Sequence, residues 1–290
     1  MSEDLTARYE RDGYVVIGGL VSRSEVTELR EEAEALCLEK GAALASDSDA
    51  PSSDPLAAYL AIHFPHKLSS RFCEALAHPG IVDLLTSLIG ANVKCMQSML
   101  FIKHAGKPGQ AWHQDEVFIP TRDRSLTAAW IALDDATIDN GCLWAIPGSH
   151  RSGVLWPLRR HVDPEYDSIP ESFGFAHEEN DARPIEVAVG SIVFFNGYLL
   201  HKSLRNRRPD GFRRALVNHY MRRIVASVVA SGWTQSADAR SARRRSRCGR
   251  RSIRRERARR REPTLHSLRS VGLTSTFRRT IRNRLDMRRA

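Results

Sequence analysis

Between about residue 93 and residue 220, short apolar runs alternate with turn signals, and this alternation limits the fold more than any other feature. The breaks include Gly106-Lys107-Pro108-Gly109, Pro147-Gly148, Gly190-Ser191 and Pro209-Asp210-Gly211. Many short strands with regular breaks are typical of an all-β sandwich or barrel. We therefore predict a mainly β domain, with strands near residues 95–102, 128–133, 142–146, 185–189, 192–195 and 215–220.

The N-terminal part has a different sequence pattern, which predicts one short strand and two helices. Residues 14–17 (YVVI) read as the strand. Capping-box spacing from Ser22 to Glu25, followed by apolar residues at helical intervals, predicts a helix start. We expect that helix to end at Gly41, residues 46–55 to form a mobile loop, and a second helix to span about 81–89. These helices would flank the β domain.

Charge divides the chain into two parts of opposite sign. Residues 222–290 hold 22 arginines, no lysine and four acids, so they carry +18, whereas the whole chain carries +10 and residues 1–221 therefore carry −8. We predict a globular domain over residues 1–221 and a disordered tail over 222–290. The tail is either a basic appendage or the product of an altered reading frame, and the abrupt change in composition favours the second. A nucleic-acid-binding arm would usually mix lysine and aromatic residues with the arginines, whereas this tail has no lysine and, beyond Trp233 and Phe277, no aromatic residue for stacking.

Composition also indicates the cellular compartment in which the protein is expected. No stretch approaches the ~18 apolar residues that a membrane span needs, and the acidic start, MSEDLTARYERDGY, predicts no signal peptide. The five cysteines are scattered and lack CxxC pairing, which argues against a disulfide scaffold or a zinc ribbon. We expect a cytoplasmic protein without a membrane partner.

The strongest chemical signal is Trp112-His113-Gln114-Asp115 together with His201. In an extended segment, residues i and i+2 point the same way, so His113 and Asp115 can present an imidazole and a carboxylate to one point. His201, from a distant strand, would complete a 2-His-1-carboxylate face. Such a face leaves positions open and suits non-haem Fe(II) that binds a co-substrate and O₂.

Other histidines offer weaker alternatives. A second His-x-Asp, His161-Val162-Asp163, and the related His177-Glu178-Glu179 lie in charged, proline-broken stretches, so we interpret both as surface loops. His150 and His219 are rival third ligands. His219 sits in the last clear strand and is expected to face the pocket or the core without binding metal.

Seven segments in register resemble the phytanoyl-CoA dioxygenase family of Fe(II)/2-oxoglutarate oxygenases. The resemblance covers roughly residues 8–221 and is carried by Arg11–Val16, His113-Gln114-Asp115, Trp130, Asn140–Trp144, Pro147–His150, His201-Lys202-Ser203 and Gly211–Ala215. It implies a double-stranded β-helix, a cupin-like jelly roll, which agrees with the strand-rich pattern. It also implies that His150 has a structural role.

The resemblance implies a role for each matching residue. His113, Asp115 and His201 match the iron ligands, and Arg213 matches the arginine that binds the far carboxylate of 2-oxoglutarate. A guanidinium suits that role because it grips a carboxylate through two parallel hydrogen bonds. The remaining matches to the 2-oxoglutarate pocket are Gln114, Trp130 and Ser203, with Met99 and Lys67 supported by fewer neighbouring residues. Without the resemblance, Arg213 could be a surface residue beside Arg214, Trp130 core filler and Ser203 a turn cap.

The function implied is hydroxylation of a small organic metabolite, with 2-oxoglutarate and O₂ consumed and succinate and CO₂ released. The intact Asp115 favours hydroxylation over halogenation, because related halogenases carry a small residue at that position. One alternative is a catalytically inactive metal-binding jelly roll, left with an open sheet edge if the C-terminal strand is lost. Another is nucleic-acid binding through the basic tail. Neither the substrate nor the oligomeric state can be inferred from the sequence.

Overall fold

A computed structural model describes residues 4–44, 56 and 59–223, all within one compact unit, residues 1–228. The predicted mobile loop at 46–55 and all but the first two residues of the predicted disordered tail lie outside the described residues. The last described strand extends through Arg222, one residue beyond the predicted domain boundary.

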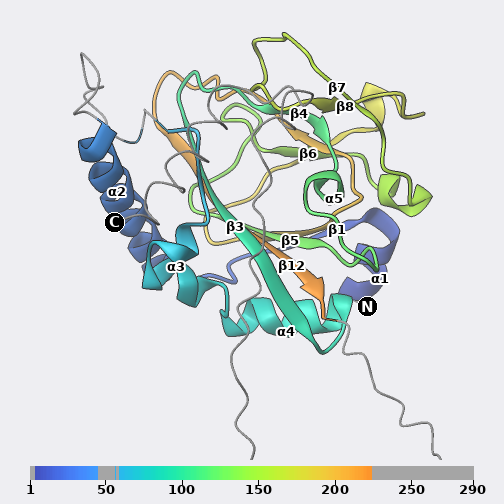
Figure 1. Cartoon of the computed structure of the whole chain (residues 1–290), viewed down its shortest axis with the longest axis horizontal. Helices are drawn as coiled ribbons and strands as arrows, with labels where there is room; N and C mark the ends of the chain where they lie inside the picture. Colours follow the sequence, from blue (N-terminus) through green and yellow to red (C-terminus); the bar gives the residue numbers. More distant parts are fainter. Residues whose placement is uncertain (1–3, 45–55, 57–58, 224–290) are drawn as a thin grey trace, which may run out of the picture. The chain divides into compact units, whose positions relative to one another are not determined.

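The larger of two main sheets has six antiparallel strands (Figure 1). Their spatial order is β1 (Tyr14–Ile17), β10 (Ile192–Asn196), β5 (Thr127–Ala132), β12 (Phe212–Arg222), β3 (Val93–His104) and β2 (Ala61–His63). Strand β12 pairs with β3 on one side and β5 on the other. The last described strand is therefore central in its sheet, whose edge strands among the described residues are β1 and β2.

The smaller sheet faces the larger one. It consists of β4 (Gln110–His113), β11 (His201–Ser203), β6 (Leu143–Ala145) and β9 (Arg183–Ile185), and a separate ribbon pairs β7 (Leu158–Arg159) with β8 (Glu171–Ser172). Buried residues from both sheets, including Trp130, Leu143, Ile185 and Val217, form one apolar layer between them. Two facing antiparallel sheets are the arrangement that the sequence predicts.

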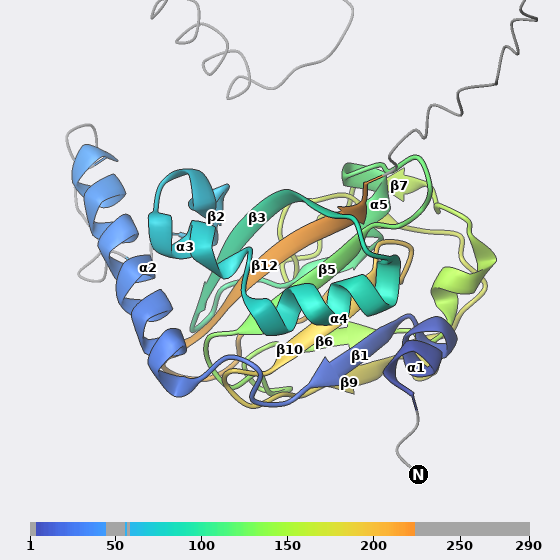
Figure 2. The same ribbon diagram turned by 90° about the horizontal axis from the view of Figure 1, so that it is seen from below.

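Helices cover the other face of the large sheet. Helices α3 (Ser70–Ala75) and α4 (Pro79–Ile89) lie over that face and α2 (Arg23–Leu44) lies near its end (Figures 1 and 2). The remaining helical segments are α1 (Leu5–Asp12), α5 (Asp115–Phe118), η3 (Pro65–Lys67), η4 (Ser149–Ser152) and η5 (Glu179–Asp181). Alternate strand residues, such as Ile131 and Leu216, pack with Phe72, Ile81 and Leu85 beneath the helices. The neighbouring strands β5 and β10 are thus buried on both faces.

Two sequence expectations for this region need correction. Helix α2 does not end at Gly41 but continues to Leu44, because the good helix formers Ala42 and Ala43 follow the glycine. The strand predicted at 185–189 lies earlier in the chain, since β9 spans Arg183–Ile185 and Val187 makes only an isolated bridge to Ala136.

Residues Ser70–Ile89 are long and apolar enough, by length and composition, to cross a membrane. The structure divides this stretch into α3 and α4, with His78 as the N-cap of α4. Phe72, Ile81 and Leu85 of this stretch are fully buried and belong to the core beneath the helices.

Candidate active site

Strand pairing brings together three side chains that are far apart in the sequence. His113 ends β4 and lies directly opposite His201, the first residue of β11, in the antiparallel register. Gln114 is extended, so Asp115, the first residue of α5, returns to the side of His113. The ligand atoms of His113, Asp115 and His201 lie within 4.8 Å of one another, and all three residues are buried. Asp115 Oδ1 is 3.7 Å from Nε2 of each histidine.

Hydrogen bonds orient each ligand toward the common centre. Nδ1 of His113 donates to the Ala111 carbonyl at 2.7 Å, and Nδ1 of His201 donates to the Leu199 carbonyl at 3.0 Å. Each imidazole therefore keeps the lone pair of Nε2 for the centre. Asp115 is held in turn by His219, whose Nε2 donates to Oδ2 at 2.8 Å and leaves Oδ1 facing the two histidines.

The protonation states fit a metal site. Burial, and then the neighbouring His201, lower the pKa of His113 to about 4, so its imidazole is neutral near pH 7. Burial opposes ionisation of Asp115, but His219 and His201 outweigh it and hold the pKa of this carboxyl below its ordinary value. Imidazole nitrogens and an ionised carboxylate are the donor set of a 2-His-1-carboxylate centre, so the residues present fit a non-haem Fe(II) ion.

The triad opens into a cavity of about 240 Å³ between the two sheets. The lining includes Met99 and Lys103 from β3, Trp130 from β5, Ser203 from β11, and Arg213 and His219 from β12. The cavity thus joins the three ligand atoms to two buried cationic side chains.

Among the described residues, Arg213 is the cation that most clearly lacks a partner. Its side chain is buried, its Nε has no hydrogen-bond partner, and its guanidinium carbon lies 5.5 Å from the centre of the Trp130 ring. Within residues 4–44, 56 and 59–223, no carboxylate forms an ion pair with it. Burial lowers the pKa of Arg213 to about 10, which still leaves it charged near pH 7. A buried, unpaired guanidinium is costly, and an anion in the cavity would satisfy it.

Only some of the other residues predicted for the 2-oxoglutarate pocket line the cavity. Trp130, Ser203 and Met99 line the cavity, whereas Gln114 and Lys67 do not. The Gln114 amide is fully buried and donates to the Val154 and Tyr198 carbonyls, while its oxygen accepts from the Trp156 amide. Because His113 and Asp115 face the cavity, the residue between them must face away.

Lys67 also lies away from the site. It is exposed in η3, and its ammonium lies 4.6 Å from the centre of the Phe64 ring. Sequence reasoning instead missed Lys103, a buried lysine that directly follows the predicted strand at 95–102. His219 had been expected to face the pocket or the core, and it contacts Asp115 from the cavity wall.

The alternative motifs lie away from the triad. His161 is in a loop, where Nε2 donates to the Ile169 carbonyl. His177 is 3.9 Å from Asp181 at the surface. His150 holds α1, because its Nε2 donates to the Glu10 carbonyl at 3.1 Å. Among the described residues, only His113, Asp115 and His201 form a group that could hold a metal.

Comparison with known proteins shows which family the chain resembles. The family pattern described as Phytanoyl-CoA dioxygenase (PhyH) matches residues 9–215. Phytanoyl-CoA dioxygenase 1 of Oryza sativa subsp. japonica is 34% identical over 174 residues, which are 60% of each chain. The peroxisomal phytanoyl-CoA dioxygenase of Rattus norvegicus is 30% identical over 251 residues, covering 80% of this chain and 72% of the rat protein. The chain spans about 60% of the length of the rice and Arabidopsis thaliana relatives.

Solved structures extend the comparison to the fold. The non-heme monooxygenase ThoJ, in its apo form, superimposes with a TM-score of 0.60 at 25% identity, covering 76% of this chain and 77% of ThoJ. EvdO2 from Micromonospora carbonacea var. aurantiaca, complexed with 2-oxoglutarate, gives 0.61 at 20% identity over 77% and 92% of the two chains. The predicted double-stranded β-helix is confirmed. From the family match and the similarity to the rat enzyme, the chain belongs to the phytanoyl-CoA dioxygenase family.

Proposed function

We propose that this protein is an Fe(II)- and 2-oxoglutarate-dependent dioxygenase that hydroxylates a small organic metabolite and releases succinate and CO₂. The observation that carries the proposal is the meeting of His113, Asp115 and His201 in a cavity that also holds the unpaired Arg213. Family membership supports it. Two proteins of similar fold also support it, since EvdO2 was solved with 2-oxoglutarate and SnoN with Fe³⁺ and alpha ketoglutarate.

Charge balance favours a dianionic co-substrate. Fe(II), the Asp115 carboxylate and 2-oxoglutarate together carry one net negative charge, so a dianionic co-substrate calls for a cation in the cavity wall, a role that Arg213 fits. Arg213 is also suited by shape, because its planar fork can donate two parallel hydrogen bonds to one carboxylate. Trp130 packs beside it and fixes one side of the guanidinium.

The chain's residues hold and orient the reactants, while a bound iron would supply the redox and O₂ chemistry. His113 and His201 present Nε2, and His219 keeps Asp115 turned toward them. Arg213 would bind the far carboxylate of the co-substrate. Burial of these groups between two sheets limits the access of water to the centre.

The substrate is expected to be small and largely apolar. Apart from the groups already named, the cavity wall includes the apolar residues Leu60, Phe118, Ile119 and Ile169 and the polar residues His63, Gln97, Gln110 and Asp167. A mainly apolar cavity with a few polar groups is typical of small-molecule sites. Asp115 occupies the ligand position that would otherwise be open to halide, so hydroxylation is the outcome we propose.

Anaerobic titration of the protein with Fe(II) and 2-oxoglutarate tests the site without a known substrate. We expect a weak visible charge-transfer absorption that needs both additions, and succinate release on exposure to O₂. A metabolite library can then be screened for compounds that stimulate succinate release. Fe(II) binding with no 2-oxoglutarate turnover, coupled or uncoupled, would instead support an inactive metal-binding protein.

A further inference from the structure

Two cationic side chains lie directly opposite each other in the wall of the cavity. Lys103 of β3 and Arg213 of β12 are register partners in the antiparallel pair, and both line the cavity. Each is only 3% exposed. Like charges directly opposite in a sheet are destabilising, and burial increases their cost. An anion received between them would offset that cost.

The ammonium of Lys103 has three oxygen neighbours but no carboxylate partner among the described residues. Nζ donates to Ser203 Oγ at 3.0 Å, to the Leu204 carbonyl at 2.6 Å and to the Gly141 carbonyl at 3.4 Å. Three acceptors match the three hydrogens of an ammonium. The side chain is therefore held in one position beside Ser203.

Lys103 also determines what the Ser203 hydroxyl can do. Ser203 Oγ accepts from Lys103 Nζ and, at 3.2 Å, from the backbone amide of Gln110. A hydroxyl has two lone pairs and one hydrogen, so with both lone pairs engaged it can act only as a donor to a further group. Ser203 lines the cavity, where the group that it can meet is a ligand acceptor.

We propose that Lys103 is a positioning residue for the far carboxylate of 2-oxoglutarate, an inference that rests on the proposed function. It commits the Ser203 hydroxyl to donate to that carboxylate and places a second positive charge beside Arg213. Burial, and then Arg213, hold the pKa of Lys103 well below its ordinary value, and Cys142 and Asp167 offset this only in part. A bound carboxylate would stabilise the ammonium form.

Isothermal titration of the full chain loaded with Mn(II) can test this role without turnover. The probes are 2-oxoglutarate and 2-oxopentanoate, which keeps the keto acid but lacks the far carboxylate. We expect the wild type to prefer 2-oxoglutarate, and Lys103→Met to reduce that preference by about 10- to 100-fold through weaker 2-oxoglutarate binding alone. Lys94→Met is the matched control, since Lys94 is exposed on the same strand and should leave the preference unchanged.

A second variant tests the route through Ser203 and does not depend on the folding of Lys103→Met. Ser203→Ala should reduce the same preference by about tenfold, and Lys103→Met should cost less in the Ser203→Ala background than in the wild type. A merely structural lysine would weaken both probes together and leave their ratio unchanged.

The outcomes separate this inference from the proposed function. If the wild type does not prefer 2-oxoglutarate over 2-oxopentanoate, the proposed function fails and this inference with it. If the wild type shows the preference but Ser203→Ala or a folded Lys103→Met retains it in full, only the role of Lys103 is overturned.

Discussion

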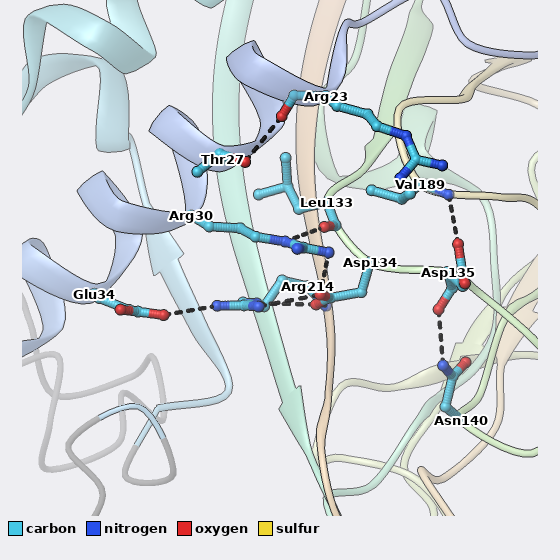
Figure 3. A network of polar contacts seen from close by, with 10 residues as sticks. All are labelled: Arg23, Thr27, Arg30, Glu34, Leu133, Asp134, Asp135, Asn140, Val189 and Arg214. Atoms are coloured by element: carbon cyan, nitrogen blue, oxygen red, sulfur yellow. Dashed lines mark hydrogen bonds and ion pairs between the residues drawn. The ribbon is translucent and has the colours of Figure 1, made fainter.

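Arg213 and Arg214 are neighbours in β12, yet the two faces of the strand give them opposite surroundings. Arg214 Nε lies 2.9 Å from Asp134 Oδ2, and Arg214 Nη1 lies 3.2 Å from Glu34 Oε1 (Figure 3). Arg30 of α2 binds the other oxygen of Asp134 at 2.7 Å. Arg213, on the cavity face, has the Trp130 ring and no such carboxylate. Arg214 therefore has a structural role, because Asp134 and Glu34 supply its carboxylate partners. Arg213 has no carboxylate partner among the described residues, so its guanidinium is available for a ligand.

The pKa values of the two arginines reflect these different surroundings. Burial lowers the pKa of Arg214, but Asp134 and Glu34 outweigh burial and leave it raised. For Arg213 burial dominates, and the pKa falls to about 10. We therefore expect changes on the cavity face to affect ligand binding, and changes on the helix-facing side to affect stability.

The largest effect expected on the cavity face comes from Asp115→Ala. The change removes the anionic ligand that His219 of β12 holds in place, so hydroxylation should be abolished and Fe(II) affinity should fall. Equilibrium dialysis with Fe(II) and a succinate assay measure the two losses. Wild-type hydroxylation with iron as the only added metal would show that Asp115 is not a ligand.

On the opposite face, Arg214→Met should lower the free energy of unfolding by about 3 kcal/mol, the low end of the range for breaking a buried ion pair, because Arg30 still compensates Asp134. Urea denaturation measures this loss. Affinity for 2-oxoglutarate should stay within about twofold of the wild type. If Arg214→Met instead loses 2-oxoglutarate binding and keeps its stability, then Arg214, and not the cavity face, contributes to ligand binding.

Arg213→Lys should leave stability and iron binding nearly unchanged but raise the 2-oxoglutarate requirement by about one to two orders of magnitude. The positive charge remains, while the loss of the planar fork removes about one charge-assisted hydrogen bond, worth roughly 1.5–3 kcal/mol. Succinate release as a function of 2-oxoglutarate concentration measures the shift. If Arg214→Lys has this effect and Arg213→Lys does not, the roles of the two residues are exchanged.

His219→Ala should weaken Mn(II) binding by about tenfold, because a partner that orients a ligating carboxylate is lost. His219→Gln provides the control, since its amide can still donate to Asp115 and should recover part of the affinity. Equal affinity of the alanine variant and the wild type would mean that Asp115 needs no support from β12.

The smallest effect is expected from His161→Ala, which removes an imidazole that contacts only its own loop. Mn(II) affinity should stay within about twofold of the wild type. A loss comparable to that of Asp115→Ala would mean that the wrong His-x-Asp motif was chosen.

Much of this organisation could be predicted from the sequence because it repeats with short periods. The strands around Trp130 and Phe194 and the pairing of His113 with Asp115 on one side all follow from alternation. The same alternation should have excluded Gln114 from the pocket, but its match to the family outweighed that argument. Lys103 could not be identified because its role depends on the register that sets it opposite Arg213, which a sequence does not display. Gly41 failed as a helix end because the good helix formers Ala42 and Ala43 follow it and continue the helix.

The central place of β12 has a consequence for how the chain is made. Strands β1, β10 and β5 connect to β3 and β2 only through β12, which is translated after all of them. Without residues 212–222 the large sheet would be divided into two ribbons, β1-β10-β5 and β3-β2, and each would have an additional unpaired edge open to aggregation. Arg213 and His219 both belong to β12. The strand that joins the two halves of the sheet therefore also supplies two residues of the active-site cavity.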